Sequence, residues 1–491
     1  MPIDTPEWVR DAVFYQVFPD RFARSARLVP AGPFEPWEAA PTRHGFKGGD
    51  LFGVAERLPE LEELGITALY LTPIFSSASN HRYHAYDYLE VDPLLGGETA
   101  LRELLDRAHE RGIRVILDGV FNHCGRGLWQ FHHVLENGAA SPYRDWFHLD
   151  PAVLSGAREL NAYPDRGGAS GGALGYKAWW GLPALPKFNT DHPEVREFLL
   201  GVAEHWLRFG IDGWRLDVPG EIDDPAFWAE FRLRCRAIDP EAYLVGEIWD
   251  EAPDWLRGDR FDALMNYPLG TAILGYAGAE HTDWDVIARH DSYRRMVHAL
   301  DGPGFATRLD ALMRNYDPDV VAVQLNLIGS HDAPRALTIL GADRRAIRLA
   351  MLLQLTLPGA PCIYYGDEIG MEGDHDPDNR QAFPVDPAAG DRDLRGFVRD
   401  VIAARREHVG LRRGTVRILG AAEGAVAYLR EADGEVAAVA VNAGSTAASL
   451  EAVLPSDVSF RPLALPGLSP GTWIDGLLNL PPQGALVLVG S

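Results

Sequence analysis

The segment GIDGWRLDVPGE, residues 210–221, ends an apolar run with two opposite charges, Arg215 and Asp217. Successive side chains of a strand point to opposite faces, so in a strand these two would share one face. The apolar residues that alternate with them would share the other face. An isolated Arg-x-Asp pair is more often a structural salt bridge than part of a reactive site, so other segments must decide between these explanations.

Acidic residues and histidines also end other apolar runs of the chain. They are Asp118, Asn122 and His123 at the end of the run 113–121, Glu247 in the run 242–249, and His331 and Asp332 in the run 323–332. A structural role would be the simpler explanation for any one of them. Their joint occurrence at corresponding ends of different runs favours a common site.

Two of these carboxylates are placed for the cleavage of a glycosidic bond. Neighbouring strands lie about 4.8 Å apart, so Asp217 and Glu247, at the ends of consecutive runs, could lie about 5 Å apart. That separation is typical of a retaining glycosidase, whereas an inverting one needs about 6.5–9.5 Å. Arg215 would hold one carboxylate, the nucleophile Asp217, in its ionised form. The other would donate a proton at a raised pKa, and Asp332 would stabilise the positive transition state.

The elements that must position these residues alternate regularly. Eight apolar runs are separated by helical patterns, and the runs are 12–18, 66–74, 113–121, 211–218, 242–249, 261–267, 323–332 and 360–369. The helical pattern 192–210 repeats apolar residues every 3.6 positions and ends at a glycine. Continuously apolar strands belong to sheets that are covered on both faces. The pattern therefore predicts an α/β fold, a parallel (β/α)8 TIM barrel with its site at the carboxyl ends of the strands.

Two further parts are predicted around the barrel. The interval between Asp118 and Asp217 is far longer than the about 25–40 residues of one βα unit. Its excess is rich in Gly, Pro and aromatic residues and indicates an inserted domain after the third strand, residues 124–186. The short alternation beyond residue 411 predicts a C-terminal antiparallel β-sandwich, 411–491. The catalytic barrel would then comprise 1–123 and 187–410.

Composition limits the classes of partner. The 491 residues carry a formal charge of −24, which argues against nucleic acid and against an anionic membrane, since either requires a concentrated basic surface. The three cysteines, Cys124, Cys235 and Cys362, have no paired spacing, so neither a disulfide framework nor a zinc site is indicated. The N-terminus does not have the pattern of a signal peptide, and no apolar run is long enough to span a membrane. We expect a cytoplasmic protein.

Four short motifs carry a resemblance to a known family. The motifs DGVFNH (118–123), GWRLDV (213–218), GEIW (246–249) and GSHD (329–332) resemble the four ordered signature regions of the α-amylase superfamily, glycoside hydrolase family 13. The resemblance extends from about residue 8 to the end. It implies three catalytic residues: Asp217 as the nucleophile, Glu247 as the acid/base and Asp332 as the third carboxylate.

The resemblance also implies which residues bind the glucan. Those at the cleavage point would be Arg215, His123, His331 and, stacked beneath the sugar, Tyr86 of YHAY. Those further along the glucan would be Glu221, Asp376 and Arg380. The aromatic pair Trp179 and Trp180 could stack on sugar faces or fill the core of the inserted domain.

Within the superfamily, the chain is most similar to the neopullulanase, cyclomaltodextrinase and maltogenic amylase group. LPKFN (185–189) resembles that group's MPKLN, whereas VPGE (218–221) replaces Val-Ala-Asn-Glu, and His84 and Tyr86 stand where the group usually has Asp and Ala. The likeness implies a retaining hydrolase of α-1,4 bonds in maltooligosaccharides, cyclodextrins or pullulan. The first barrel strand begins near residue 12, so we expect the group's N-terminal dimerisation domain to be absent and the protein to be a monomer or a non-standard dimer.

Three alternatives stay open. The same scaffold supports transglycosylases and sugar isomerases, and a non-catalytic binding subunit is disfavoured because all three carboxylates are present.

The superfamily often holds a structural Ca²⁺, and Asn122 matches one usual ligand, but the acidic N-terminal loop of many relatives is not evident in 20–32. No cofactor is expected to be required. Calcium is therefore considered but not predicted, and no residue is assigned to a metal.

Overall fold

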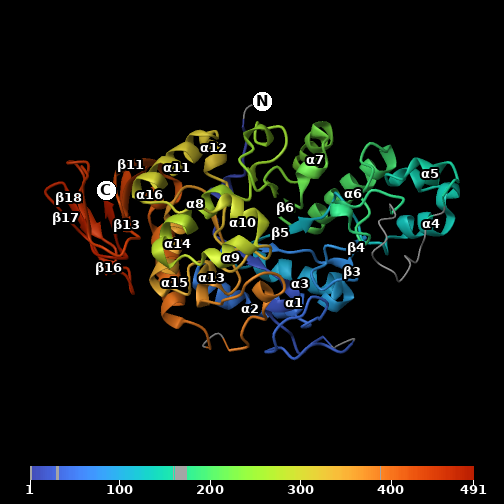
Figure 1. The fold of residues 1–491 in the computed structure, drawn as a ribbon, viewed down its shortest axis with the longest axis horizontal. Coiled ribbons are helices and arrows are strands. Elements are labelled where there is room, and N and C mark those ends of the chain that lie inside the picture. The colour runs from blue at the N-terminus through green and yellow to red at the C-terminus, as the bar shows by residue number, and fades with distance from the viewer. Residues whose placement is uncertain (1–2, 29–31, 159, 161–173, 387–388, 491) are drawn as a thin grey trace.

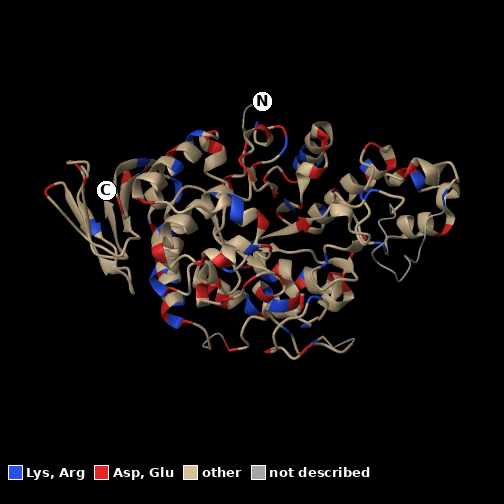
Figure 2. Ribbon diagram, in the orientation of Figure 1, with Lys and Arg blue, Asp and Glu red and all other residues tan. Residues whose placement is uncertain are grey.

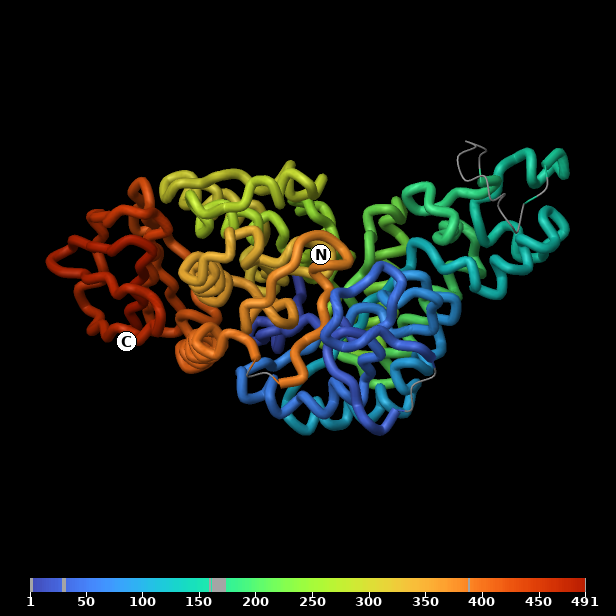
Figure 3. Tube along the Cα trace, turned by 60° about the horizontal axis from the view of Figure 1, so that its bottom comes forward, coloured from blue at the N-terminus to red at the C-terminus, as the bar shows by residue number. Residues whose placement is uncertain are grey.

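The computed structural model describes residues 3–490 except 29–31, 159, 161–173 and 387–388. An elongated molecule results, with the C-terminal sheets at one end, a barrel in the middle and the segment that follows the third barrel strand at the other end (Figures 1 and 3). Charged residues of both signs are interspersed over the outer helices (Figure 2). Among the helices of the described residues, none is long and apolar enough to cross a membrane.

Eight parallel strands form the barrel. In chain order they are β1 (Phe14–Val17), β2 (Ala68–Leu71), β5 (Arg114–Gly119), β6 (Gly213–Leu216), β7 (Tyr243–Gly246), β8 (Ala263–Leu264), β9 (Leu325–Asn326) and β10 (Ala360–Tyr364). They are hydrogen-bonded in the order β8-β7-β6-β5-β2-β1-β10-β9, and a parallel bridge between Met265 and Leu325 joins the two outer strands. The predicted barrel is confirmed, and each predicted run contains one of these strands.

Helices cover the outside of the barrel (Figure 1). The longer ones are α2 (Leu51–Leu64), α3 (Gly97–His109), α6 (Pro193–Phe209), α7 (Pro225–Ile238), α8 (Tyr267–Ala277), α11 (Gly302–Arg314), α14 (Arg344–Thr356) and α15 (Arg392–Glu407). The shorter ones are α1 (Pro19–Phe22), α9 (Trp284–Arg289), α10 (Asp291–Met296), α12 (Pro318–Val321), α13 (Ala336–Ile339) and α16 (Val409–Arg413). In α6 the apolar stripe is buried, and Gly210 ends the helix at φ 112°, a left-handed conformation that glycine adopts without strain.

The apolar core has two layers. One cluster fills the barrel and contains inward side chains of its strands, among them Phe14, Tyr70, Ile116 and Tyr243. The larger cluster lies between the strands and the surrounding helices. Because both faces of the strands are buried, the strands are almost continuously apolar, as parallel sheets require. Polar side chains are thereby confined to the strand ends.

The segment between β5 and β6 has little regular structure. It contains α4 (Trp129–Asn137), α5 (Pro151–Leu154) and isolated antiparallel bridges, two of which, His123 with Lys187 and Phe147 with Phe188, tie it to its own ends. A hairpin of β3 (Phe75–Ser77) and β4 (Ala85–Val91) lies in the preceding connection. The insertion after the third barrel strand is therefore present as predicted.

Two sheets form the C-terminal part. The larger contains β11 (Thr415–Ala422), β12 (Ala425–Ala432), β13 (Glu435–Asn442), β15 (Phe460–Pro462), β16 (Ser469–Pro470) and β19 (Gly484–Gly490). The smaller contains β14 (Ala448–Glu451), β17 (Thr472–Ile474) and β18 (Leu477–Leu480). Leucine and alanine side chains from both sheets form one buried cluster. The predicted sandwich is present, antiparallel except where β16 pairs with β19.

Two buried arginines form hydrogen bonds where the barrel meets the C-terminal part. Arg405 of α15 donates hydrogen bonds to five backbone oxygens, those of Leu355, Leu357, Gly359, Leu411 and Arg412. Arg430 of β12 donates to the carbonyls of Gly414 and Thr356. Burial lowers the pKa of Arg405 to about 10 and that of Arg430 to about 9, so both remain cationic at neutral pH. Each guanidinium thus satisfies carbonyls where the helix α14 ends.

The variant Arg405→Ala should lower the free energy of unfolding by at least about 3 kcal/mol, since several buried carbonyls would lose their donor. Arg406→Ala removes the exposed neighbouring arginine and should change it by less than about 0.5 kcal/mol. The measurement is the thermal unfolding midpoint of both variants against the unchanged protein. Equal midpoints for the two variants would show that Arg405 is not a structural fastening.

Candidate functional site

The register of the barrel strands brings four charged residues together. Asp118 of β5 is the partner of Arg215 in β6, and Leu216 is the partner of Gly246 in β7. One residue further on, the amide of Asp217 donates to the carbonyl of Gly119 and that of Glu247 to the carbonyl of Leu216. Asp217 and Glu247 are therefore neighbours at the carboxyl ends of adjacent strands, and adjacent strands of a sheet lie about 4.8 Å apart.

Arg215 is the common partner of these carboxylates. Its Nη1 donates to Asp118 Oδ1 at 2.8 Å and to Asp217 Oδ1 at 2.9 Å, and its Nη2 forms an ion pair with Glu247 Oε2 at 3.0 Å. The side chain has no solvent exposure. One planar cation thus holds three carboxyl groups in place, and the ion pair first noticed in the sequence belongs to the site.

Two tyrosines complete the surroundings of Asp118. The hydroxyls of Tyr70 and Tyr83 each donate to Asp118 Oδ2 at 2.7 Å. Burial and the nearby carboxylates raise the pKa of both phenols, which keeps them protonated and able to donate. Asp118 therefore accepts hydrogen bonds from three side chains. Burial raises the pKa of Asp118, and these donors oppose that rise.

The end of β9 supplies a second group. The Nε2 atom of His331 lies 2.6 Å from the hydroxyl of Tyr83, and its Nδ1 atom lies 2.7 Å from the side-chain amide nitrogen of Gln16. The His331 ring stacks on the Tyr83 ring at a centroid distance of 5.3 Å. Arg380 donates to the carbonyl of His331 at 2.8 Å and to Asp332 Oδ1 at 3.2 Å. The Tyr83–His331 contacts join this group to the carboxylates around Arg215.

Asp376 lies at the outer side of Arg380. Its Oδ1 is 3.0 Å from Arg380 Nη1, and its side chain is more exposed than that of Asp332. The structure therefore brings Asp332, Arg380 and Asp376 together in one row that leads from His331 towards solvent. A row of this kind can contact a ligand that extends out of the barrel mouth.

Glu247 has two further donors besides the cation. The amide of Val218 donates to its Oε2 at 3.1 Å and the indole Nε1 of Trp249 to its Oε1 at 2.9 Å. The Trp249 ring is held between Tyr267, stacked at 3.9 Å, and His290, at 5.9 Å. Sequence reasoning did not single out Trp249, although a residue two positions after Glu247 shares its face on a strand.

Tyr86 is not part of this cluster. Its side chain is 38% exposed, and it lies beside Gly127. The tyrosine that contacts Asp118 and His331 is Tyr83, the first residue of the same YHAY motif. Tyr83 precedes β4 in the connection from β3, whereas Tyr86 lies within β4, so strand alternation does not indicate which of the two tyrosines turns inward.

His123 and Glu221 flank the cluster. His123 is buried, and its Nδ1 is 3.2 Å from the side-chain amide nitrogen of Asn122. Its Nε2 has no hydrogen-bond partner among the described residues. Burial lowers the pKa of His123 to about 3, so the ring is neutral and one ring nitrogen remains for a ligand. Glu221, in a short 3-10 turn (Pro219–Glu221), is 49% exposed, and its Oε2 lies 3.9 Å from Lys187 Nζ.

Burial dominates the protonation of the central pair. It raises the pKa of Asp217 well above its usual range and that of Glu247 as well, while Arg215 lowers both. Each carboxylate also disfavours the ionisation of the others. The expected action of Arg215 on Asp217 has the right sign but is outweighed by burial. Because Asp118, Asp217 and Glu247 share one cation, we expect the cluster to retain a proton and to titrate as a unit.

Asn122 is the residue that the family resemblance connects with calcium. Asn122 Oδ1 is buried without a hydrogen-bond partner, as a metal-ligating oxygen could be. Around it, however, the described part of the chain gathers no three His, Cys, Asp or Glu side chains suited to an ion. We assign no metal ligands and derive no step through an ion.

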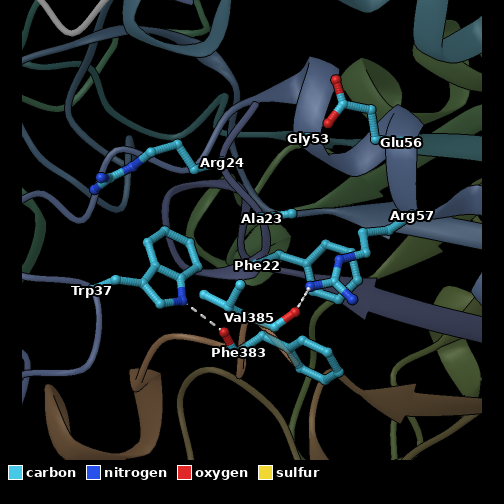
Figure 4. A pocket seen from close by; sticks show the side chains of 9 residues that line it. All are labelled: Phe22, Ala23, Arg24, Trp37, Gly53, Glu56, Arg57, Phe383 and Val385. Carbon is cyan, nitrogen blue, oxygen red and sulfur yellow. Dashed lines mark hydrogen bonds between the residues drawn. The ribbon is translucent and has the colours of Figure 1, made fainter. Parts of the chain in front are cut away.

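A separate pocket lies outside the cluster. It has a volume of about 250 Å³ and is lined by Phe22, Ala23, Arg24, Trp37, Gly53, Glu56, Arg57, Phe383 and Val385 (Figure 4). Trp37 Nε1 donates to the carbonyl of Phe383 at 2.7 Å and Arg57 Nη2 to that of Val385 at 2.6 Å. These donors tie the 383–385 segment to the N-terminal part of the chain, so the pocket is explained by packing.

The chain is similar to known enzymes over most of its length. The family model for the α-amylase catalytic domain matches residues 16–406. The chain is 43% identical to a cyclomaltodextrinase of Geobacillus thermopakistaniensis over 91% of this chain and 71% of that protein. It is 42% identical to neopullulanase 2 of Thermoactinomyces vulgaris over 84% of this chain and 66% of that protein.

A solved structure gives the same picture. The cyclic α-maltosyl-(1→6)-maltose hydrolase from Arthrobacter globiformis, in complex with that sugar, has 35% sequence identity and a TM-score of 0.85. The match covers 99% of this chain and 100% of the solved chain. The similarity therefore includes the C-terminal sheets as well as the barrel.

The variant Arg215→Met should cost about 3–5 kcal/mol of stability near pH 7, because it leaves buried carboxylates without their cation. Their native pKa values, already raised, would rise further, so the folded variant would bind protons that the unfolded chain releases above about pH 4. The loss should therefore be small near pH 4 and grow as the pH rises. Thermal midpoints across this range measure it.

Arg114→Met is the matched control at the opposite end of β5. Arg114 pairs with Asp212 at 2.7 Å and is 46% exposed. Asp212 is buried but keeps His109 and the backbone amide of Val115 as partners, so the loss of Arg114 should cost clearly less than the loss of Arg215. A pH-independent loss for Arg215→Met would contradict the shared-proton cluster.

Proposed function

Since this chain belongs to the α-amylase family, glycoside hydrolase family 13, and is an α-glucan hydrolase like its relatives, we propose that it cleaves α-1,4-glucosidic bonds by double displacement. The observation that carries this proposal is the contact of one guanidinium with both Asp217 and Glu247. A carboxyl pair bridged in this way is compatible with the about 5–5.5 Å separation of retaining enzymes.

The first step would form a covalent intermediate. Glu247 gives its proton to the glycosidic oxygen while Asp217 attacks the anomeric carbon, so the bond to the leaving sugar breaks as the bond to Asp217 Oδ forms. In the second step Glu247 takes a proton from water, and that water displaces Asp217 with overall retention. Asp332 stabilises the positive charge that develops on the sugar ring in both steps.

The shared proton suits this division of labour. Burial raises the pKa of Asp118, but its tyrosine and arginine donors oppose this rise, so we place the shared proton on Asp217 or Glu247. Only the state with the proton on Glu247 and the charge on Asp217 leads to products. The acid and base limbs of the pH–rate profile would then report the pair rather than single residues.

The substrate class follows from the relatives. The similarity to a cyclomaltodextrinase and to a neopullulanase supports cyclodextrins, maltooligosaccharides and pullulan as the proposed substrates of this chain. His123, His331 and Arg215 would contact the sugar at the cleavage point, with Tyr83 in place of Tyr86 beside it. Arg380, Asp376 and Glu221 would contact the glucan further along.

A second candidate is cleavage of α-1,6 bonds. The Arthrobacter relative is named for a cyclic sugar with 1→6 linkages, and the match to it covers almost all of this chain. Transfer of the glucosyl group to a second sugar is a third possibility on the same scaffold. Chromatography of early products from maltotriose, β-cyclodextrin and pullulan separates these activities. Cleavage of α-1,4 bonds in pullulan gives panose and cleavage of α-1,6 bonds gives maltotriose, two isomers that differ in retention, while transfer gives longer products.

Hydrolysis should proceed with retention, giving the α-anomer as the first product. The expected reason is the adjacent position of Asp217 and Glu247 at the ends of β6 and β7. Proton NMR within the first minutes of reaction, before mutarotation, measures the anomer. A β-anomer would exclude the covalent intermediate on Asp217.

The two carboxylates should differ in their response to the leaving group. Asp217→Asn should lower kcat by several orders of magnitude with every substrate, because the nucleophile is lost. Glu247→Gln should keep more activity on an activated aryl α-maltoside, whose leaving group requires no proton, and added azide should restore its turnover as an α-azide adduct. Asp332→Asn should impair both substrate types.

Asp254→Asn is the control, because this carboxylate is 71% exposed and paired with Arg257 on the surface. It should leave kcat unchanged. If Asp217→Asn and Glu247→Gln responded identically to leaving group and azide, the roles assigned to them would be wrong.

A further inference from the structure

We propose that Trp180 is a sugar-stacking residue that binds a glucan unit beyond the bond being cleaved, an inference that rests on the proposed function. Trp180 belongs to a 3-10 turn, Trp179–Gly181, in the segment between β5 and β6. Its side chain is 79% exposed, which is unusual for so large an aromatic ring. One face of this ring is available to a ligand.

A stack of three rings leads from Trp180 to His123. The Trp180 ring lies 4.6 Å from Trp179 at an interplanar angle of 10°, and Trp179 lies 5.2 Å from His123 at 18°. His123 follows the carboxyl end of β5, the strand that carries Asp118. The exposed ring is therefore the outer end of a row that begins at the cleavage point.

The backbone gives a second, independent observation. Trp180 has φ 50° and ψ 22°, a left-handed conformation that a bulky residue adopts only at a cost. A glycine would take this conformation without strain. Such strain persists mainly where a side chain serves a function, and here the strained residue presents an indole to solvent. A purely structural role would favour a smaller residue at this position.

The chemistry of the ring specifies the ligand. A pyranose has faces of C–H groups that pack on an aromatic plane and bury apolar surface from water, while its hydroxyls stay solvated at the edge. A stacked pair supported from behind by His123 is already ordered, so binding costs little side-chain entropy. The site would thus take one further glucose unit of a linear, cyclic or branched α-glucan.

The effect should be confined to long substrates. Stacking on a sugar that does not react stabilises the bound ground state and the transition state equally, which lowers KM without changing kcat. An aryl α-maltoside is too short to reach the ring, whereas maltohexaose and β-cyclodextrin are long enough. The chain-length dependence of KM is therefore the signature of this site.

The experiment compares Trp180→Gly, Trp180→Phe and the unchanged protein on an aryl α-maltoside, maltohexaose and β-cyclodextrin. Trp180→Gly should raise KM for at least one of the two long substrates about tenfold at constant kcat, the change expected from losing one aromatic contact. Its KM and kcat on the aryl α-maltoside should not change. Trp180→Phe should restore most of the loss. The thermal midpoint of Trp180→Gly should not fall, because glycine relieves the backbone strain.

Trp129→Ala is the matched control, since this tryptophan is 60% exposed in the same inserted segment but packs on His133. It should leave all constants unchanged. Unchanged KM values of Trp180→Gly on both long substrates, or an equal effect of Trp129→Ala, would overturn the inference. So would an equal loss on short and long substrates. If the unchanged protein hydrolysed none of the three substrates, that result would instead overturn the proposed function.

Discussion

Three buried carboxyl groups share one buried cation, and this charge imbalance governs the centre of the molecule. Arg215 contacts Asp118, Asp217 and Glu247 from the middle strand of three adjacent strands. Because burial penalises each negative charge, the three cannot all be ionised against one guanidinium without a large cost. A cluster that retains one proton avoids this cost. Acid–base catalysis of the proposed kind requires such a proton.

The barrel is the condition for this arrangement. Parallel register places Asp118 beside Arg215 and carries Asp217 next to Glu247, so the strands that bury the apolar core also align the charges at its edge. The apolar barrel interior and the layer of helices exclude water from below and from the sides. In this low-dielectric position each hydrogen bond to the carboxylates has a larger effect than in solvent. Stability and chemistry therefore depend on the same strand pairing.

The residues in the outer part of the site lie in loops, which constrain their positions less than the barrel strands do. Arg380 holds Asp332 and Asp376 from the loop after β10, and Trp249 holds Glu247 while packed between two rings. The inserted segment contributes the tryptophans Trp179 and Trp180, which stack on His123 at the end of the third barrel strand. Loops tolerate strain and variation that strands do not. Differences in glucan preference between relatives with this barrel are therefore expected in these loops, while the carboxylates keep their positions.

The sequence by itself determined the order of the eight strands, the insertion after the third, the C-terminal sheets and the charged strand ends, because apolar periodicity and strand length are local properties. It did not distinguish Tyr83 from Tyr86, because Tyr83 lies in the connection before β4, where strand alternation does not apply. It did not reveal that burial outweighs Arg215 in the pKa of Asp217, or that Trp180 is left-handed and exposed. These properties depend on which distant segments surround a side chain, and only the tertiary structure decides that.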